Sequence, residues 1–337
     1  MGIIFSEGSG LNNSVFGICQ APIRKLIEDK AEGWEKKSML AEFFHMDTTT
    51  NGLDLISGMT AMDGFKPVGE NGAYPANHQQ EGYSKTLVQH TWKSSFAISK
   101  EAIQDSKTMD LKKKPQAFIK AYYRTRENFG AAVLGGAITG KSAIQFEGRT
   151  FDITCADGKP VFSTQHKPKI KGNVQSNLFS NEFSADALDR AEAAMQQFKG
   201  DNGDLLGVAP VTIAIANIPA LKRKVFEVVG ADLDPNSVNN GFNFQVGRWN
   251  IKVWNYLNQF LGADAEPWML IDDDYNEENE GAVWYDRQEL EVYSYIENGN
   301  GANVWNGDAR FSAGFNDFRF ACLGGVAGGT DLTQLKL

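Results

Sequence analysis

The sequence lacks most of the features that mark secreted, membrane-spanning or disulfide-stabilised proteins. Its 337 residues include three cysteines, which are far apart and odd in number, so neither a disulfide framework nor a cysteine-based zinc site is expected. The first basic residue is Arg24, so no secretory signal peptide is indicated. The most apolar run, Val208 to Leu221, contains two prolines and is too short to cross a bilayer. We therefore expect a protein of a reducing interior that does not bind membranes.

Positive charge is also scarce. Lys and Arg number 33 against 42 Asp and Glu, which gives a net charge of −9. A free nucleic-acid-binding protein needs a basic surface for its phosphate contacts, so this class is disfavoured. Core-forming residues, in contrast, are plentiful, because 42% of the chain is hydrophobic and 22 residues are Phe. The composition predicts a folded chain, and the length suggests roughly two domains.

Residues 1–62 have little to bury by themselves. Glycine and asparagine interrupt any regular pattern there, and only the short stretch 23–34 shows apolar residues at helical spacing. We therefore expect an N-terminal arm that lies on another part of the protein or on a neighbouring molecule.

Residues 63–100 are predicted to form an extended loop. Glycine and proline punctuate the first half, and the second half alternates with the period of two that is typical of a strand. One face of that alternation holds Thr86, Val88, His90, Trp92, Ser94, Phe96 and Ile98. The run is longer than the usual strand of about five or six residues, and this face is only partly apolar. We therefore predict a projecting hairpin that is half solvated until a partner docks on it.

The clearest helical pattern runs from Leu111 to Gly135. Its apolar residues follow the 3.6-residue period, Pro115 suits the first turn, and two glycines suit a C-terminal cap. Short strand patterns follow this helix within 101–175. Strands and helices then alternate over 176–307, and 308–337 hold a closing strand and a tail. This order indicates an α+β or α/β arrangement.

One nucleotide-binding motif matches formally, between Gly135 and Ser142. In a Walker A loop Lys141 would reach the outer phosphates and Ser142 would bind Mg²⁺. A P-loop has a strand before it and a helix after it, whereas here the predicted helix precedes the motif and a strand-like segment follows. We interpret the motif as a Gly-rich helix end, and keep a P-loop nucleotide hydrolase as the disfavoured alternative of a different class.

An acidic run at residues 272–278 resembles a calcium loop in part. Three of its residues have the alternate spacing of calcium ligands: Asp272, Asp274 and Asn276. The glycine of the loop is replaced by Glu277, and Val283 stands where the bidentate glutamate belongs. An acidic surface loop is the favoured interpretation, with loose ion binding left open.

Catalytic constellations are not evident. The four histidines form no HExxH motif and no close pair, and no serine lies in a GxSxG sequence. We therefore expect a protein that is not an enzyme and has no catalytic, cofactor or metal residues.

The order of these segments resembles the major capsid proteins of tailed bacteriophages, with the Hong Kong 97-type fold. The phrase Gly158-Lys159-Pro160-Val161-Phe162-Ser163-Thr164-Gln165-His166 looks like a loop that recurs in this family. The resemblance covers most of the chain. It implies an α+β fold with an N-terminal arm (1–62), an extended loop (63–100), a peripheral domain with a long spine helix (101–175), an axial domain (176–307), and a return to the peripheral domain with a C-terminal tail (308–337).

The resemblance also implies a structural function. Subunits would assemble as pentamers and hexamers into an icosahedral head, in the virion, after synthesis in the bacterial cytoplasm. The implied partners are other copies of the chain, a separate scaffolding protein, a portal, a possible decoration protein, and packaged double-stranded DNA that is contacted only non-specifically. The alternative within the fold is an encapsulin-type bacterial nanocompartment, which encloses a cargo enzyme instead of a genome.

Four residues of the extended loop are the candidates for contacts between subunits: Lys85, Val88, Trp92 and Phe96. Two aromatic anchors on one strand face would contribute several kcal/mol when a neighbour buries them. The alternative is that Trp92 and Phe96 pack inside their own subunit. Some relatives cross-link a lysine of this loop to a neighbour; Lys85 and Lys93 are present, but lysines on a hairpin surface are ordinary, and covalent cross-linking is not expected.

Overall fold

The computed structural model describes residues 4–6, 17–59, 65–70, 72–76, 81–105, 112–230, 243–262 and 265–335. The chain divides into two compact units, and each is made of segments that are distant in the sequence. The first unit comprises Met1–Asp54, Leu87–Gly130 and Trp284–Ala313. The second comprises Leu55–Thr86, Ala131–Val283 and Gly314–Leu337.

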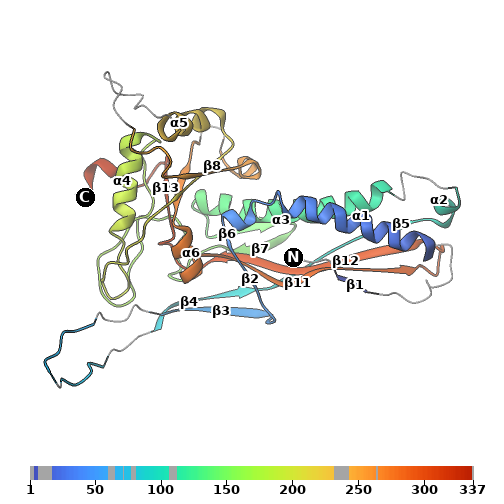
Figure 1. The fold of residues 1–337 in the computed structure, drawn as a ribbon, viewed down its shortest axis with the longest axis horizontal. Coiled ribbons are helices and arrows are strands. Elements are labelled where there is room, and N and C mark those ends of the chain that lie inside the picture. Colours follow the sequence, from blue (N-terminus) through green and yellow to red (C-terminus); the bar gives the residue numbers. More distant parts are fainter. Residues whose placement is uncertain are drawn as a thin grey trace. The chain divides into compact units, whose positions relative to one another are not determined.

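The first unit is built on a sheet with the strand order β1-β11-β12-β5, and β2 also pairs with β11. Helices α1 and α3 run side by side along this sheet (Figure 1). The strands are β1 (Ile4–Ser6), β2 (His45–Thr48), β5 (His90–Ile98), β11 (Ala282–Ile296) and β12 (Asn303–Phe315), and the helices are α1 (Gly17–Glu35), the 3₁₀ turn η1 (Leu40–Glu42), α2 (Lys100–Gln104) and α3 (Lys114–Ile138).

The core of the first unit is aromatic. Phe118 and Phe129 project from the buried face of α3 and meet rings from the sheet beneath it. Phe129 contacts Trp284 with ring centroids 5.8 Å apart, and Trp284 stacks on Phe311 at 5.1 Å. Such rings bury large apolar areas. Their packing against the sheet therefore stabilises α3 more than its intrinsic helix propensity does.

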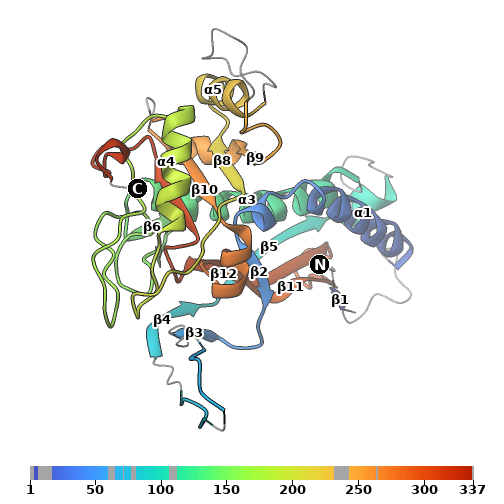
Figure 2. The same ribbon diagram turned by 60° about the vertical axis from the view of Figure 1, so that its left-hand side comes forward.

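The second unit contains a four-stranded sheet with the order β13-β10-β8-β9. Helix α4 crosses one face of it, and Figure 2 shows α5 near the end of β8. The remaining elements are β3 (Leu53–Met59), β4 (Glu81–Val88), β6 (Ala143–Phe146), β7 (Arg149–Asp152), α4 (Ala185–Gln196), β8 (Thr212–Ala216), α5 (Pro219–Val229), β9 (Asn250–Trp254), η3 (Asn255–Phe260), β10 (Trp268–Ile271), α6 (Asp273–Asn279), β13 (Ala321–Gly324) and η4 (Leu332–Gln334).

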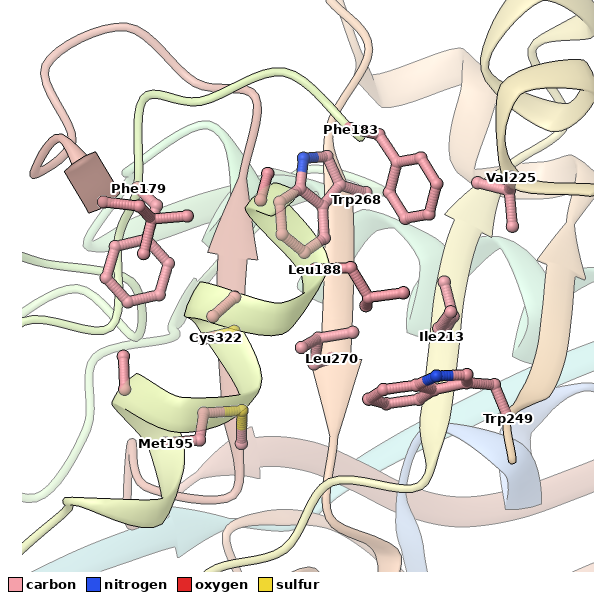
Figure 3. Close-up of a cluster of buried hydrophobic side chains, with 14 of the residues drawn as sticks. Phe179, Phe183, Leu188, Met195, Ile213, Val225, Trp249, Trp268, Leu270 and Cys322 are labelled. Carbon is pink, nitrogen blue, oxygen red and sulfur yellow. The ribbon is translucent and has the colours of Figure 1, made fainter. Parts of the chain in front are cut away.

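The hydrophobic core of the second unit lies between α4, α5 and this sheet (Figure 3). Leu188 and Met195 of α4 are fully buried in one cluster with Leu270 of β10 and Cys322 of β13. Ser184 caps the start of this helix, because its side chain accepts a hydrogen bond from the Ala187 backbone N–H.

Helix α3 confirms the predicted spine helix with shifted ends. It runs from Lys114 to Ile138 instead of from Leu111 to Gly135, and Leu111 lies outside the described residues. The helix continues through both glycines instead of ending at them. Neighbouring side chains leave no room for a larger residue at these two positions. A Cβ on Gly136 would lie 2.3 Å from the Ile144 side chain.

The alternating run at 86–98 differs from the prediction. It is divided between β4, which pairs with β3, and β5, which pairs antiparallel with β12 over its whole length. The buried face also changes phase, because the side chains of Lys85 and Leu87 are buried at the end of β4 whereas that of Ile98 is buried in β5. A break at Gln89 moves the inward side from odd to even residue numbers, so the run is not one side of a single hairpin.

The predicted closing strand likewise divides in two. β12 ends at Phe315 and β13 begins at Ala321. Between the two strands lies a turn in which the Asp317 carboxylate accepts a hydrogen bond from the Arg319 backbone N–H.

Candidate assembly surface

The hairpin of β3 and β4 carries the most exposed apolar side chains of the described chain. In β3, Leu53 and Leu55 are 61% and 66% exposed. In the described part of the connecting loop, Phe65 and Tyr74 are completely exposed, and Val68 is half exposed. Burial of each large apolar side chain is worth about 1.5–3 kcal/mol, so a neighbouring molecule that covered them would bind strongly. This surface is a candidate for contacts between subunits.

The strand β4 is fixed firmly within its own unit. The Lys85 ammonium is 2.5 Å from the Asp152 carboxylate and donates to the Thr154 hydroxyl at 2.9 Å. Burial raises the pKa of Asp152, but the hydrogen bonds from Lys85 and Thr154 outweigh it, and the pKa is lowered overall. Lys85 is itself 7% exposed. Its ammonium is therefore engaged in its own subunit rather than presented on the hairpin surface, and its contact with a neighbour stays a prediction.

Two glycines face each other across the hairpin. A Cβ on Gly58 would lie 2.8 Å from the Tyr83 carbonyl oxygen, and one on Gly82 would lie 2.8 Å from the Gly58 carbonyl oxygen. Real Cβ atoms do not approach backbone atoms so closely. The close approach of the two strands at this point therefore requires glycine at both positions. The Gly82 carbonyl also accepts a hydrogen bond from the Lys169 ammonium at 2.6 Å.

Trp92 and Phe96 pack inside the first unit. The Trp92 ring stacks on Phe311 with centroids 4.9 Å apart, and its indole N–H donates to the Phe311 carbonyl at 3.2 Å. Phe96 stacks on Trp305 at 6.0 Å and contacts Phe118 at 5.2 Å. Both side chains are half-buried, as the alternative of packing in their own subunit requires. Their role between subunits stays a prediction that these contacts do not favour.

Val88 is the one candidate among the four that the structure leaves exposed, at 49%. It is the last residue of β4 and follows the buried Leu87. The four predicted residues are therefore not gathered on one surface. The sequence analysis did not identify Leu55, Phe65 and Tyr74, although an apolar residue between glycines and prolines is a signal that could have been used.

The family-like phrase at 158–166 closes on His166, which is fully buried. Its Nδ1 is 2.7 Å from the Asp157 carboxylate, and its Nε2 is 3.1 Å from the Val161 carbonyl oxygen. Each ring nitrogen therefore faces an oxygen atom of the same unit. The ring also stacks on Phe318 at 3.7 Å. These contacts join the loop to the turn between β12 and β13. Because the His166 ring is fully buried, a substrate cannot reach it.

Asn177 connects the same loop to the strand β13. Its amide nitrogen lies within 3.2 Å of the carbonyl oxygens of Val161, Phe318 and Ala321, and its amide oxygen accepts from the Ser163 N–H at 2.9 Å. The residue is fully buried, so these bonds satisfy groups that water cannot reach. The sequence gives no warning of this role, because the partners of Asn177 are up to 144 residues away.

The Walker A match is not a phosphate-binding loop. Its first half is the last turn of α3, and β6 follows at Ala143, so the motif has a helix before it and a strand after it. The Thr139 hydroxyl donates a hydrogen bond to the Gly135 carbonyl oxygen. This order of helix and strand agrees with the interpretation as a helix end and differs from the strand–loop–helix order of a P-loop.

The acidic run at 272–278 is a capped helix and not a calcium loop. Asp272 is buried and accepts from the backbone N–H groups of Tyr275 and Ala209, and Asp273 accepts from the Thr212 hydroxyl. These carboxylates therefore hold α6 in place instead of pointing at a common ion. Across the described ranges, no three His, Cys, Asp or Glu residues are grouped to hold a metal.

A cavity of about 410 Å³ in the second unit is the place where chemistry could be sought. Its wall includes Cys155, Asp157, Asp201, Asp317 and Arg319. Arg319 binds both Asp201 and Asp317, and burial raises the pKa of the Cys155 thiol well above its usual range. A paired carboxylate and a neutral buried thiol are poor nucleophiles.

No helix in the described part of the chain has the length and apolarity that a membrane span requires.

The architecture is the Hong Kong 97-type capsid fold. A structure from Mycobacterium phage Patience aligns with a TM-score of 0.50 at 10% identity, over 98% of this chain and 94% of that one. The procapsid of bacteriophage JBD30 aligns at 0.48 and 11% identity over 96% and 77% of the chains. A virus-like particle from Pyrococcus furiosus aligns at 0.47 and 9% identity over 90% and 98%.

The family is defined by sequence. The family model described as phage capsid protein matches residues 82–323, and the chain belongs to that family. Among curated proteins, no match was found. The chain is therefore a structural capsid protein of a phage, as the sequence predicted, and an encapsulin shell is not favoured.

Proposed function

We propose that this chain assembles as pentamers and hexamers into the icosahedral head that encloses phage double-stranded DNA. The observation that carries the proposal is the exposed apolar surface of the β3–β4 hairpin on a chain of the phage capsid family. A side chain such as Phe65 that is fully solvated in one subunit would gain several kcal/mol together with its neighbours when a second subunit covers it.

Each of five segments of the chain is assigned its own structural role. Residues 1–62 serve as the arm, 63–100 as the extended loop, 101–175 as the peripheral domain with α3 as its spine, 176–307 as the axial domain, and 308–337 as the return and tail. The exposed hairpin strands and Val88 are the parts of the loop region that we assign to contacts between subunits.

Further partners belong to the same proposal. A separate scaffolding protein, a portal and a possible decoration protein would join copies of this chain, and assembly would take place in the cytoplasm of the bacterial host before the subunits reach the virion. The support for these partners is the family alone.

The test is expression of the chain alone and together with the scaffolding protein of its phage, followed by size-exclusion chromatography and electron microscopy. We expect closed particles of uniform size. A chain that stays a folded monomer under every assembly condition would contradict the proposal.

A further inference from the structure

The first half of α3, together with the short turn before it, carries positive charge without any negative charge. Between residues 112 and 126 six residues are Lys or Arg and none is Asp or Glu, in a chain whose net charge is −9. Two of the six are engaged in the subunit, because Arg126 is buried against Asp286 and Lys114 donates to the Ala97 carbonyl. The remaining four are solvent-exposed: Lys112, Lys113, Lys120 and Arg124.

These exposed cations form a stripe along one side of the helix. Lys113 lies in the π-helical turn directly before α3, and Ala117, Lys120 and Arg124 follow it at spacings of four, three and four residues, which places the three helical residues on one face with Lys113 at its start. The opposite face carries the buried residues Phe118 and Phe129. The rise of about 1.5 Å per residue separates Lys113 from Arg124 by about 16 Å. Because Ala117 is small, the long side chains beside it have free space to move.

Among the residues that the structure describes, no carboxylate neutralises the stripe. Within the described chain, Lys113, Lys120 and Arg124 form no ion pair. The adjacent helix α1 contacts α3 through its Glu35, which accepts a hydrogen bond from the Tyr123 hydroxyl at 3.0 Å, while Glu32 of α1 binds Lys36, the residue directly after the helix. The positive charge therefore faces solvent.

We propose that this stripe, Lys113, Lys120 and Arg124, binds the phosphate backbone of double-stranded DNA without sequence preference. Over about 16 Å one strand of a duplex presents about five phosphates, since they lie about 3.4 Å apart along the axis. Flexible lysines and arginines make such contacts, which position DNA but do not read its bases. The inference rests on the proposed function, because a head protein meets DNA only if it builds the head.

The composition of the stripe favours a nucleic acid over an acidic protein. A protein interface has an apolar or aromatic centre, whereas no large apolar side chain is exposed anywhere between 112 and 138. The polar residues around the cations, such as Gln116 and Asn128, suit a hydrated phosphate surface instead.

The test compares three full-length proteins. One is the unchanged chain, one is the triple variant Lys113→Gln/Lys120→Gln/Arg124→Gln, and one is the control variant Lys141→Gln/Lys222→Gln/Arg223→Gln. The control also removes two lysines and one arginine, all exposed and without an ion pair in the described residues. Binding of a dye-labelled 30-base-pair duplex of random sequence is followed by fluorescence anisotropy across a series of salt concentrations.

We expect the stripe variant to bind the duplex more weakly and with a smaller salt dependence. Each lost phosphate contact lowers the slope of log affinity against log salt by about 0.9, so three contacts lower it by about 2 to 3. The control variant should keep the slope of the unchanged chain. The single variant Lys120→Gln should lower the slope by about 0.9, which keeps the test valid if the triple variant folds poorly.

Three results would overturn the inference. The unchanged chain could fail to bind the duplex, or the stripe and control variants could lose the same affinity, which would make net charge the cause. The stripe variant could also keep its DNA slope and lose binding to polyglutamate, which would assign the stripe to an acidic protein. Electron microscopy of all three proteins separates this outcome from the proposed function, which fails only if no protein forms particles.

Discussion

At the scale of single residues, Arg126 shows how a charge is accommodated in the aromatic core of the first unit. Its guanidinium binds the Asp286 carboxylate through two bonds, of 2.6 and 2.9 Å, and lies 4.8 Å above the ring of Trp284. Both charges are almost fully buried. Desolvation offsets much of the attraction in such a pair, so its main effect is to fix which residues meet.

The sequence could place Arg126 but not its partner. The residue falls on the inward face of the predicted helix, where a lone arginine would be unfavourable. Asp286 is 160 residues away, and no local pattern distinguishes it from the other acidic residues. Periodicity reports which face of an element is buried, whereas the pairing of polar groups depends on the tertiary fold.

The buried pair of Asp157 and His166 makes the stability of the second unit depend on pH. Burial raises the pKa of Asp157, but the hydrogen bond from His166 and its charge lower it, and the net effect is a pKa below the usual value. A folded-state pKa below that of the unfolded chain means that the unfolded state binds more protons at acidic pH. This contribution to stability is therefore complete above the ordinary aspartate pKa of about 3.9 and is lost as the pH falls through the folded value.

We predict that Asp157→Asn lowers the free energy of unfolding at pH 7 by about 1–3 kcal/mol, because the His166 ring loses a charged partner. The variant should also show a weaker decline of stability between pH 5 and pH 3 than the unchanged chain. Urea unfolding of the unassembled protein, followed by tryptophan fluorescence, measures both. Asp204→Asn, at an exposed carboxylate without an ion pair in the described residues, is the control and should change neither. An equal acid sensitivity of Asp157→Asn and the unchanged chain would contradict the assignment.

At the scale of elements, long periodic segments were predictable and the pairing of strands was not. Helix α3 follows from its 3.6-residue pattern to within three residues at each end. The run at 86–98 has a period of two, but a period of two does not say which strand lies beside it. β4 joins a hairpin and β5 joins the sheet of the first unit, and the one-residue break at Gln89 is invisible in the sequence.

The close approach of Gly58 and Gly82 should control whether the hairpin forms. We predict that Gly82→Val destabilises the hairpin by about 1–3 kcal/mol, because its Cβ would overlap the Gly58 carbonyl, which belongs to the backbone and cannot move away by rotation. Limited proteolysis of the unassembled chain should then cleave β3 or β4 faster than in the unchanged protein. Gly69→Ala, where no atom lies within 4 Å, is the matched control and should leave the cleavage rate unchanged. Equal cleavage of Gly82→Val and the unchanged protein would show that the strands separate without cost.

At the scale of the whole molecule, the class of the protein was easier to predict than its contact residues. The order of arm, loop, helix and sheets extends along the whole chain, so many weak patterns agree on one fold. A contact residue depends on which side of one strand faces outwards. Trp92 and Phe96 were reasonable candidates as aromatic residues on a half-polar strand, but both pack within their own unit. Phe96 lies in register with Trp305, and Trp92 stacks on Phe311, which is two residues along β12 from the register partner of Trp92.

The exposed and the packed aromatic residues should therefore behave differently when they are replaced. We predict that Phe65→Ser/Tyr74→Ser leaves the free energy of unfolding of the unassembled chain within about 0.5 kcal/mol, because both side chains are already in water. The same variant should form fewer or less heat-resistant particles, because the apolar area that a neighbour would cover is gone.

Trp92→Ala should instead destabilise the unassembled chain by about 3 kcal/mol, as replacement of a packed ring does. Denaturation followed by circular dichroism, together with particle counts from electron microscopy, measures both properties. If Phe65→Ser/Tyr74→Ser gives particles of normal yield and heat resistance, the exposed loop is not part of the contact between subunits; if Trp92→Ala unfolds like the unchanged chain, the Trp92 ring contributes little to its own unit and docking on a neighbour becomes its better assignment.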